Sequence, residues 1–141
     1  MASDCIFCKI VRKAAPSSVV YEDSQVLAFL DIRPLSEGHT LVIPKTHYET
    51  VFDIPEKLLM EVHKSVKQVA FAVKETVKAD GISIIQLNGK AAEQDVFHLH
   101  VHVVPRFEGK KLSRFTELAL ADRENLDEVA ELIRKNFPVK L

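Results

Sequence analysis

The sequence has no tryptophan and very few cysteines, methionines, tyrosines and glycines: two, two, two and four among 141 residues. Two cysteines are too few for the disulfide framework of a small secreted domain. No stretch approaches the roughly eighteen apolar residues of a membrane-spanning helix, and Met1–Asp4 lacks the basic start of a secretory signal. We therefore expect a cytoplasmic protein, or in a eukaryotic cell also a nuclear one, with no membrane partner.

An excess of charge of one sign is also absent. Nineteen lysines and arginines stand against twenty acidic residues, which gives a formal net charge of −1. A chain with this balance has no strong field to attract a nucleic-acid backbone, so we expect no nucleic-acid partner. The length fits one domain, and 47% hydrophobic residues are enough to build a core.

Hydrophobic periodicity predicts an α+β fold: a five-stranded antiparallel sheet with one long helix and a C-terminal helical tail. The connections are mostly too short for parallel crossovers. The long helix should have Pro55 in its first turn and stop at Asp80-Gly81. The predicted strands are Val19–Tyr21, Val26–Ile32, Thr40–Ile43, Ile82–Leu87 and Phe97–Val104, and the predicted helices are Asp53–Asp80 and Thr116–Phe137.

Three histidines at alternate positions, His98, His100 and His102, are the most informative feature. In a strand their rings share one face, while the intervening apolar residues point to the other. A neutral imidazole whose second nitrogen donates a hydrogen bond can act as a nucleophile, and neighbouring rings can donate to a phosphoryl group. Histidines two residues apart on a strand can also share a zinc ion, so a catalytic metal site is the main alternative. A set of ordinary buried or surface histidines is the less favoured interpretation.

The second motif is Cys5-Ile6-Phe7-Cys8, half of a tetrahedral zinc site or a redox pair. A thioredoxin-like motif follows a strand and opens a helix, whereas only four residues precede Cys5. The position favours metal binding over redox chemistry.

Together these blocks resemble the histidine-triad (HIT) superfamily of nucleotide hydrolases and transferases, in particular its zinc-containing, Hint-like branch. The resemblance runs from about Cys5 to Pro105 through four blocks of sequence. It implies a HIT domain over residues 1–107 with an extension of the same domain over 108–141, and a homodimer that joins two sheets. The blocks are CIFCKI at 5–10, AFLDIRP at 28–34, GHTLVIPK at 38–45 and HLHVHVV at 98–104.

The resemblance also implies residue roles. His100 would attack the α-phosphorus of a purine nucleotide and form a nucleotidyl-histidine, with His98 and His102 beside it as the other catalytic residues. The backbone carbonyl of His98 would accept the Nδ1 proton of His100, and His102 would bond phosphate oxygens. The implied nucleotide-binding residues are Phe7, Ile10, Asp31, Ile32, His39, Asn88, Gln94, Asp95 and Val96. A structural zinc ion, with no organic cofactor, would be held by Cys5, Cys8, His47 and His98.

The activity that this resemblance favours is that of a nucleoside phosphoramidase, which cleaves the P–N bond of phosphoramidates or acts on aminoacyl-adenylate substrates. A dinucleoside polyphosphate hydrolase, or a nucleotide-binding or interaction protein with incidental hydrolysis, are the alternatives. Two positions depart from the family pattern. Glu93 stands where glycine is usual, and Asp95 stands where a small or hydroxyl residue is common and can meet the leaving group.

Overall fold

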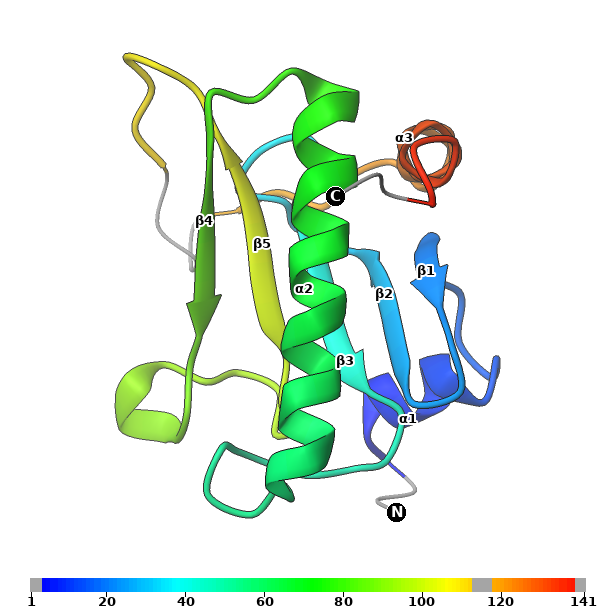
Figure 1. Cartoon of the computed structure of the whole chain (residues 1–141), viewed down its shortest axis with the longest axis vertical. Helices are drawn as coiled ribbons and strands as arrows, with labels where there is room; N and C mark the ends of the chain where they lie inside the picture. The colour runs from blue at the N-terminus through cyan, green and yellow to red at the C-terminus, as the bar shows by residue number, and fades with distance from the viewer. Residues whose placement is uncertain (1–3, 113–117, 139–141) are drawn as a thin grey trace.

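The computed structural model describes residues 4–112 and 118–138 of the chain. Five strands form one sheet in the order β1-β2-β3-β5-β4, and every neighbouring pair is antiparallel (Figure 1). The predicted α+β class with a five-stranded antiparallel sheet is confirmed. The strands are β1 (Val19–Glu22), β2 (Val26–Leu30), β3 (Thr40–Pro44), β4 (Gly81–Gln86) and β5 (Val101–Arg106).

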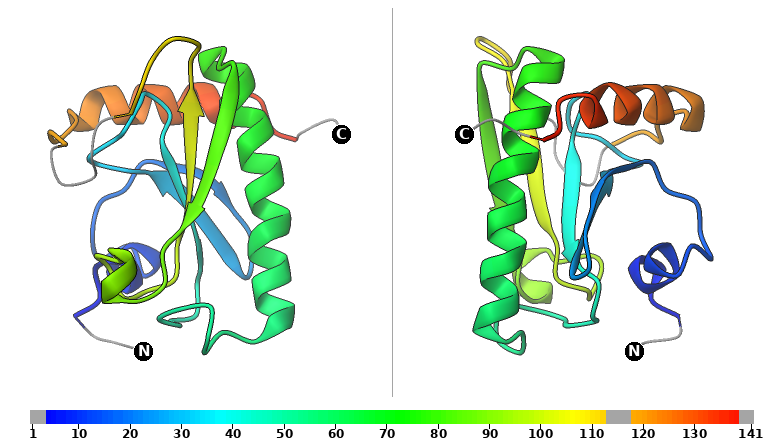
Figure 2. Two further views of the ribbon diagram at one scale, coloured as in Figure 1. Left: turned by 90° about the vertical axis from the view of Figure 1, so that its left-hand side faces the viewer. Right: turned by 45° about the vertical axis from the view of Figure 1, so that its right-hand side comes forward.

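Helices cover both faces at the centre of the sheet, and for this reason β2 and β3 are buried along their whole length. The long helix α2 (Glu56–Val77) lies across one face, and the short helix α1 (Ile6–Val11) lies on the other (Figure 2). Alternate residues of β2 divide between two cores. Ala28 packs in the core beneath α2, whereas Phe29 packs with Phe7 of α1. The sheet therefore presents its second face to α1, and the site described below lies on that face.

The helix α2 is shorter than the predicted Asp53–Asp80. It begins after Pro55 and ends where Lys78 adopts the left-handed conformation (φ 57°). The predicted glycine stop is wrong, because Gly81 instead begins β4. A lysine thus occupies the position at which glycine is usual in a helix C-cap.

The C-terminal helix α3 (Arg123–Arg134) confirms the helical tail within tighter bounds than the predicted Thr116–Phe137, whose first two residues lie outside the described ranges. It begins at residue 123 because the side chain of Asp122 caps it, accepting from the amide of Asn125. The helix packs against β1 and α2. In residues 4–112 and 118–138, no helix is both long and apolar enough to cross a bilayer.

Several strands end at other residues than predicted, either because a turn ends the strand early or because a proline is included in it. The strand β2 ends two residues early, because Asp31 starts a turn by accepting from the amide of Arg33. Pro44 and Pro105, expected to stop strands, are instead included in them. The carbonyl of Arg106 accepts from the amide of Asp80 on one side of β5. The backbone of Pro105 points to the opposite side, where its carbonyl accepts from the Ser36 hydroxyl. A proline needs no N–H partner at such a position.

Two short elements were not predicted, and one strand begins later than expected. The unpredicted elements are α1, which carries the cysteine motif, and the 3₁₀ turn η1 (Lys90–Ala92). The strand β5 starts at Val101 rather than Phe97, because residues 96–98 form a bend and residues 97–100 belong to no ladder. Phe97 itself is exposed.

Candidate active site

The three histidine side chains lie on the face of the sheet that α1 covers. His102 pairs with Leu41, a member of the apolar cluster that contains Phe7 and Ile10. The intervening Leu99, Val101 and Val103 belong to the opposite core beneath α2. The predicted alternation is therefore confirmed, even though His98 and His100 precede the first residue of β5.

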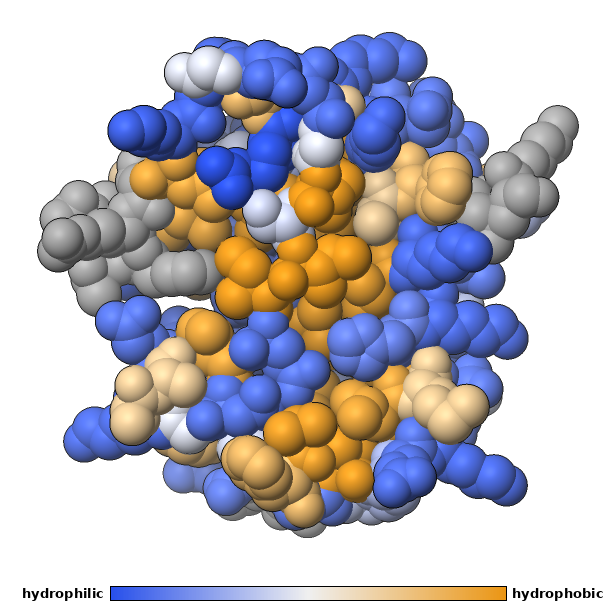
Figure 3. All heavy atoms as spheres, turned by 60° about the vertical axis from the view of Figure 1, so that its left-hand side comes forward, coloured by the Kyte–Doolittle hydropathy of each residue, from blue (hydrophilic) through white to orange (hydrophobic). Residues whose placement is uncertain are grey.

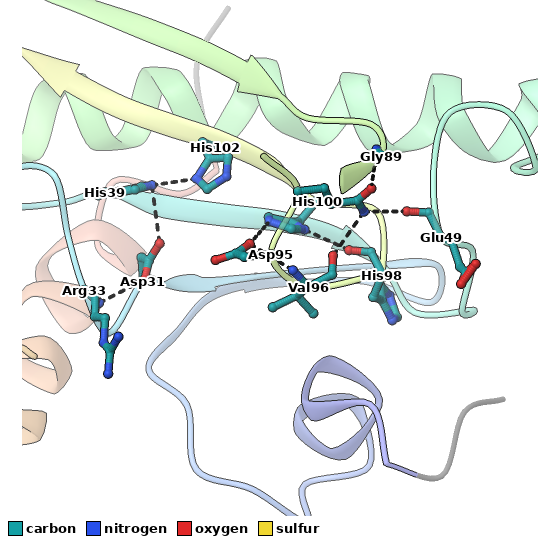
Figure 4. Close-up of polar contacts among 11 residues, drawn as sticks. Asp31, Arg33, His39, Glu49, Gly89, Asp95, Val96, His98, His100 and His102 are labelled. Atoms are coloured by element: carbon teal, nitrogen blue, oxygen red, sulfur yellow. Dashed lines mark hydrogen bonds and ion pairs between the residues drawn. The ribbon is translucent and has the colours of Figure 1, made fainter. Parts of the chain in front are cut away.

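His100 has the geometry of a fixed nucleophile. Its Nδ1 lies 2.8 Å from the carbonyl oxygen of His98, and because a carbonyl only accepts, Nδ1–H must be the donor (Figure 4). In the neutral ring, Nε2 then holds the free electron pair. The side chain is 3% exposed and contacts the edge of Phe7, with ring centroids 5.1 Å apart. This hydrogen bond is the one expected from the sequence.

A chain of hydrogen bonds sets the tautomer of His102. The amide of Leu35 donates to His39 Nδ1 (3.0 Å), so a neutral His39 carries its proton on Nε2. His39 Nε2 lies 2.9 Å from His102 Nδ1 and donates to it. His102 in turn carries its proton on Nε2, which makes that nitrogen a donor beside His100. This relay was not predicted, because no local pattern links Leu35, His39 and His102.

Burial keeps both rings of the relay neutral. It lowers the pKa of His39 to about 3, with further lowering from the nearby His102 and His100. Burial likewise lowers the pKa of His102 to about 4. Asp31 Oδ2 lies 3.6 Å from the same Nε2 atom of His39, and burial raises the pKa of this carboxyl.

Asp31, His39 and His102 also place ligand atoms within 4.8 Å of one another, as a metal site would. The tautomers argue against this use, because the His39 nitrogen that faces the cluster carries the proton. His98 directs its Nδ1 toward the sulfur atoms of Cys5 and Cys8, away from His100 and His102. The three triad rings therefore do not converge on one centre, and the alternative of a metal shared by the triad loses its geometric basis.

A pocket of about 290 Å³ opens in front of His100 and His102. Its volume is close to the lower end of the range for small-molecule sites. Asp31 accepts from the Arg33 amide with Oδ1, which leaves its Oδ2 for a ligand, and the residues predicted to surround the base, Phe7, Ile10 and Ile32, are apolar. The predicted residues that line the pocket are Phe7, Ile10, Asp31, Ile32, Asp95, Val96, His100 and His102.

Three predicted nucleotide-binding residues, His39, Asn88 and Gln94, lie outside the lining of this pocket. Asn88 accepts from the amide of Val51 and from Gln86. Gln94 is buried and bonds the backbone at residues 49, 89 and 96. These contacts shape the loop before the triad, and a direct contact of the three side chains with nucleotide stays a prediction.

The two residues that depart from the family pattern lie differently in this loop. Glu93 has φ 71°, a left-handed conformation that glycine adopts without strain, and its side chain is exposed. Asp95 instead places Oδ1 3.6 Å from His100 Nε2, with its side chain 79% exposed. Contact with the His100 ring lowers the pKa of Asp95 to about 2. An ionised carboxylate thus faces the nucleophilic nitrogen.

A second cluster joins the four residues predicted to bind metal: Cys5, Cys8, His47 and His98. Cys5 caps α1 by accepting from the amide of Cys8. The sulfur atoms of Cys5 and Cys8 lie 3.5 and 3.6 Å from His98 Nδ1, and His47 Nδ1 lies 3.4 Å from the Cys8 sulfur and 3.2 Å from His98 Nδ1. The Cys-x-x-Cys pair and the two histidines, 39 or more residues apart in sequence, are thus brought together.

The spacing and chemistry of this cluster fit a tetrahedral ion. In a tetrahedral site, bonds of about 2.0 Å to nitrogen and about 2.3 Å to sulfur place two nitrogens about 3.3 Å apart and a nitrogen and a sulfur about 3.5 Å apart. His98 Nε2 lies 2.8 Å from the carbonyl of Pro44 and donates to it, which leaves Nδ1 as a ligand. The donor set of two thiols and two imidazoles is that of a closed structural site.

The fold and the site define a class: a small antiparallel α+β protein in which a buried histidine, His100, lines a pocket, with a separate Cys₂His₂ cluster. Residues 12–109 match the HIT domain family, and the chain belongs to this family. An uncharacterized HIT-like protein of Methanocaldococcus jannaschii is 45% identical over 92% of this chain and 98% of its own length.

Two further relatives bear on the site. The crystal structure of a Zn-bound histidine triad family protein from Mycobacterium smegmatis is 44% identical, with a TM-score of 0.83 over 94% of this chain and 91% of that one. An adenylylsulfatase of Arabidopsis thaliana is 39% identical over 77% of this chain and 55% of its own length.

The buried relay predicts a loss of stability in acid. Since the pKa values of His39 and His102 are lowered in the fold, the unfolded chain binds more protons below its histidine pKa of about 6.5. The stabilisation is complete above that pH and is lost as pH falls toward 4, by several kcal/mol. Urea unfolding across this range measures the loss. His39→Asn should flatten the slope, whereas His63→Gln, on the exposed side of α2, should leave it unchanged; equal slopes in all three proteins would contradict the assignment.

Proposed function

We propose that this protein is a nucleotide hydrolase or transferase that acts at the α-phosphorus of purine nucleotides, most readily as a nucleoside phosphoramidase. One observation carries the proposal. The hydrogen bond from His100 Nδ1–H to the His98 carbonyl leaves Nε2 as a nucleophile at the end of an enclosed pocket. The same geometry suits attack on phosphorus, which splits one difficult displacement into two easier ones.

The two steps use groups already in place. His100 Nε2 attacks phosphorus, the bond to the leaving group breaks, and a nucleotidyl-histidine forms. Water then attacks phosphorus, the P–Nε2 bond breaks, and a nucleoside monophosphate is released. In both steps His102, with its proton on Nε2, donates to the phosphoryl oxygens as negative charge develops on them. The carbonyl of His98 holds His100 in the reactive tautomer throughout.

The pocket supplies groups for the rest of a nucleotide. Asp31 retains an acceptor oxygen for the two ribose hydroxyls, since Arg33 uses only Oδ1. Phe7, Ile10 and Ile32 offer apolar surfaces for a base. These surfaces carry no hydrogen-bonding group that distinguishes one purine from another, so both purine nucleotides should bind.

We further propose that Cys5, Cys8, His47 and His98 hold a structural zinc ion. The fit of the donor distances and the Zn-bound relative support this assignment. Four protein ligands would leave no open position for substrate, so the ion would contribute folding free energy. It would tie α1 and the chain around His47 to the start of the triad.

Finally, we propose a homodimer that pairs the two β4 edges. β4 lies at the edge of the sheet and contains three isoleucines, yet none of its residues is buried within one chain. Ile84 is 52% exposed. Figure 3 shows hydrophobic side chains gathered over the face on this side of the molecule. An isoleucine-rich edge strand invites pairing, and a second copy would cover it.

The nucleophile is tested with adenosine 5′-phosphoramidate. We expect the native protein to release AMP and His100→Ala to lose at least about a thousandfold in kcat/KM, because no other group can form the covalent intermediate. Intact mass after rapid quench should show a nucleotidylated chain only when His100 is present. His63→Ala is the control and should keep full activity. Release of AMP by His100→Ala at the native rate would exclude covalent catalysis by this residue.

The metal is tested by elemental analysis and thermal unfolding. We expect about one zinc per chain, lost in Cys8→Ala, with a drop of several kcal/mol in stability because a buried ligand set is left without its ion. Chelator treatment should lower the Tm of the native protein and leave that of Cys8→Ala unchanged. A native protein without bound zinc that unfolds at the same temperature with and without chelator would contradict the assignment.

The dimer is tested by light scattering. We expect the native chain to have twice its monomer mass, and Ile84→Lys to shift it toward the monomer because a charge is placed in the apolar contact. Leu132→Lys makes the same change on α3, where Leu132 is 52% exposed, and should leave the mass unchanged. A native protein of monomer mass would disprove the dimer.

A further inference from the structure

A second cavity adjoins the nucleotide pocket on the far side of Asp95. It is an open, shallow depression of about 400 Å³, and both spaces are lined by Ile6, Asp95 and Val96. The two cavities therefore meet at the residue that faces His100 Nε2. A nucleotide whose phosphorus lies at His100 would point its leaving group toward Asp95 and this second cavity, because the sugar and base occupy the first.

The charges around the second cavity are of one sign. Asp95 lines it together with Asp4 and Glu49, and no lysine or arginine is among the described residues that form its wall. Two of its other residues, Cys5 and His47, belong to the candidate metal cluster. A Zn²⁺ ion bound by two thiolates would carry no net charge and would not offset the carboxylates. The described lining of this depression therefore carries three acidic side chains and no basic one to offset them.

Asp95 is the carboxylate closest to the chemistry. Its Oδ1 is 3.6 Å from His100 Nε2, longer than a hydrogen bond, so the carboxylate lies beside the nitrogen that would attack phosphorus. Its pKa of about 2 keeps it ionised at neutral pH. Oδ1 also accepts from the amide of Val96 at 2.9 Å, which holds the side chain toward the junction.

We propose that Asp95 determines leaving-group specificity. The junction favours phosphoramidates whose leaving amine bears a second positive charge, as a diamine does, and disfavours anionic leaving groups. This inference rests on the proposed attack by His100 and names the substrate class of the same site. It sets this chain apart from a HIT protein that releases an anion.

The step balances without any additional reagent. The leaving nitrogen first takes a proton from solvent and becomes cationic. The electron pair of His100 Nε2 then forms the bond to phosphorus, and the P–N bond breaks with its pair remaining on the nitrogen, which departs as a neutral amine. Asp95 is ionised and cannot supply that proton. It stabilises the positive charge on the nitrogen and on the distal ammonium group of the leaving amine.

The test uses three AMP phosphoramidates whose leaving amines match in length: a cationic diaminopropane, a neutral butylamine and an anionic β-alanine. kcat/KM is measured for the native protein, Asp95→Asn and Glu93→Gln. Asp95→Asn keeps the Oδ1 acceptor for Val96 and removes only the charge. We expect it to lower the ratio of cationic to anionic kcat/KM about tenfold at low salt, and less at high salt. The intrinsic reactivity of each leaving amine is the same in all three proteins. Comparing the cationic-to-anionic ratio of kcat/KM between the proteins therefore isolates the effect of Asp95.

Glu93→Gln removes the same charge two residues away, from an exposed side chain that lines neither cavity. It should leave the ratio within about twofold of the native value, since an exposed charge is screened by solvent. An equal fall in both variants would assign the effect to net charge and overturn the role of Asp95. An unchanged ratio in Asp95→Asn, with the butylamine substrate still cleaved through His100, would overturn the inference and leave the proposed function intact. If the native protein cleaves none of the three substrates, both fail.

Discussion

The site depends on one residue, His98, which is fully buried and makes contacts in three directions. Its Nδ1 joins the cysteine and histidine cluster, its Nε2–H donates to the carbonyl of Pro44, and its own carbonyl accepts from His100. The end of β3, the helix α1 and the nucleophile are thereby fixed to a single imidazole and its peptide group. A shift of His98 would misplace the metal ligands and the His100 tautomer together, so the structural and the reactive parts of this protein cannot be varied independently.

Burial contributes a second constraint, because the site needs neutral imidazoles with defined protons. The apolar surroundings of His39 and His102 lower their pKa values and keep them uncharged at neutral pH. A backbone amide at Leu35 then fixes which nitrogen of each ring carries the proton. The result is a fixed hydrogen-bond donor on His102 Nε2, which in the proposed reaction meets the developing negative charge without a cation. The same burial makes the fold sensitive to acid, so reactivity and acid instability share one cause.

Much of this arrangement could be predicted from the sequence, and the failures have physical reasons. The alternation of His98, His100 and His102 with apolar residues predicted the shared face, since period two leaves little freedom in an extended chain. The helix α1 was missed because six residues are too few to show a period, and its cap is a cysteine. The relay from Leu35 through His39 to His102 depends on the register between β3 and β5, which no local pattern contains. The sequence shows that Asp95 departs from the family pattern, but its position beside His100 depends on the conformation of the loop and could not be predicted.

In the proposed function, the nucleotide and the leaving group are recognised by different segments of the chain. The walls of the nucleotide pocket come from α1 and the end of β2, which are held rigidly by the core beneath them. The leaving-group side is formed by the loop before the triad, and the buried amide of Gln94 bonds that loop to the backbone at three points. A substitution at Asp95 alters an exposed side chain on this fixed loop and disturbs neither the core nor His98. The proposed selection of the leaving group by Asp95 could therefore change in evolution while the nucleotide pocket stays the same, because this charge lies outside the interactions that build the site.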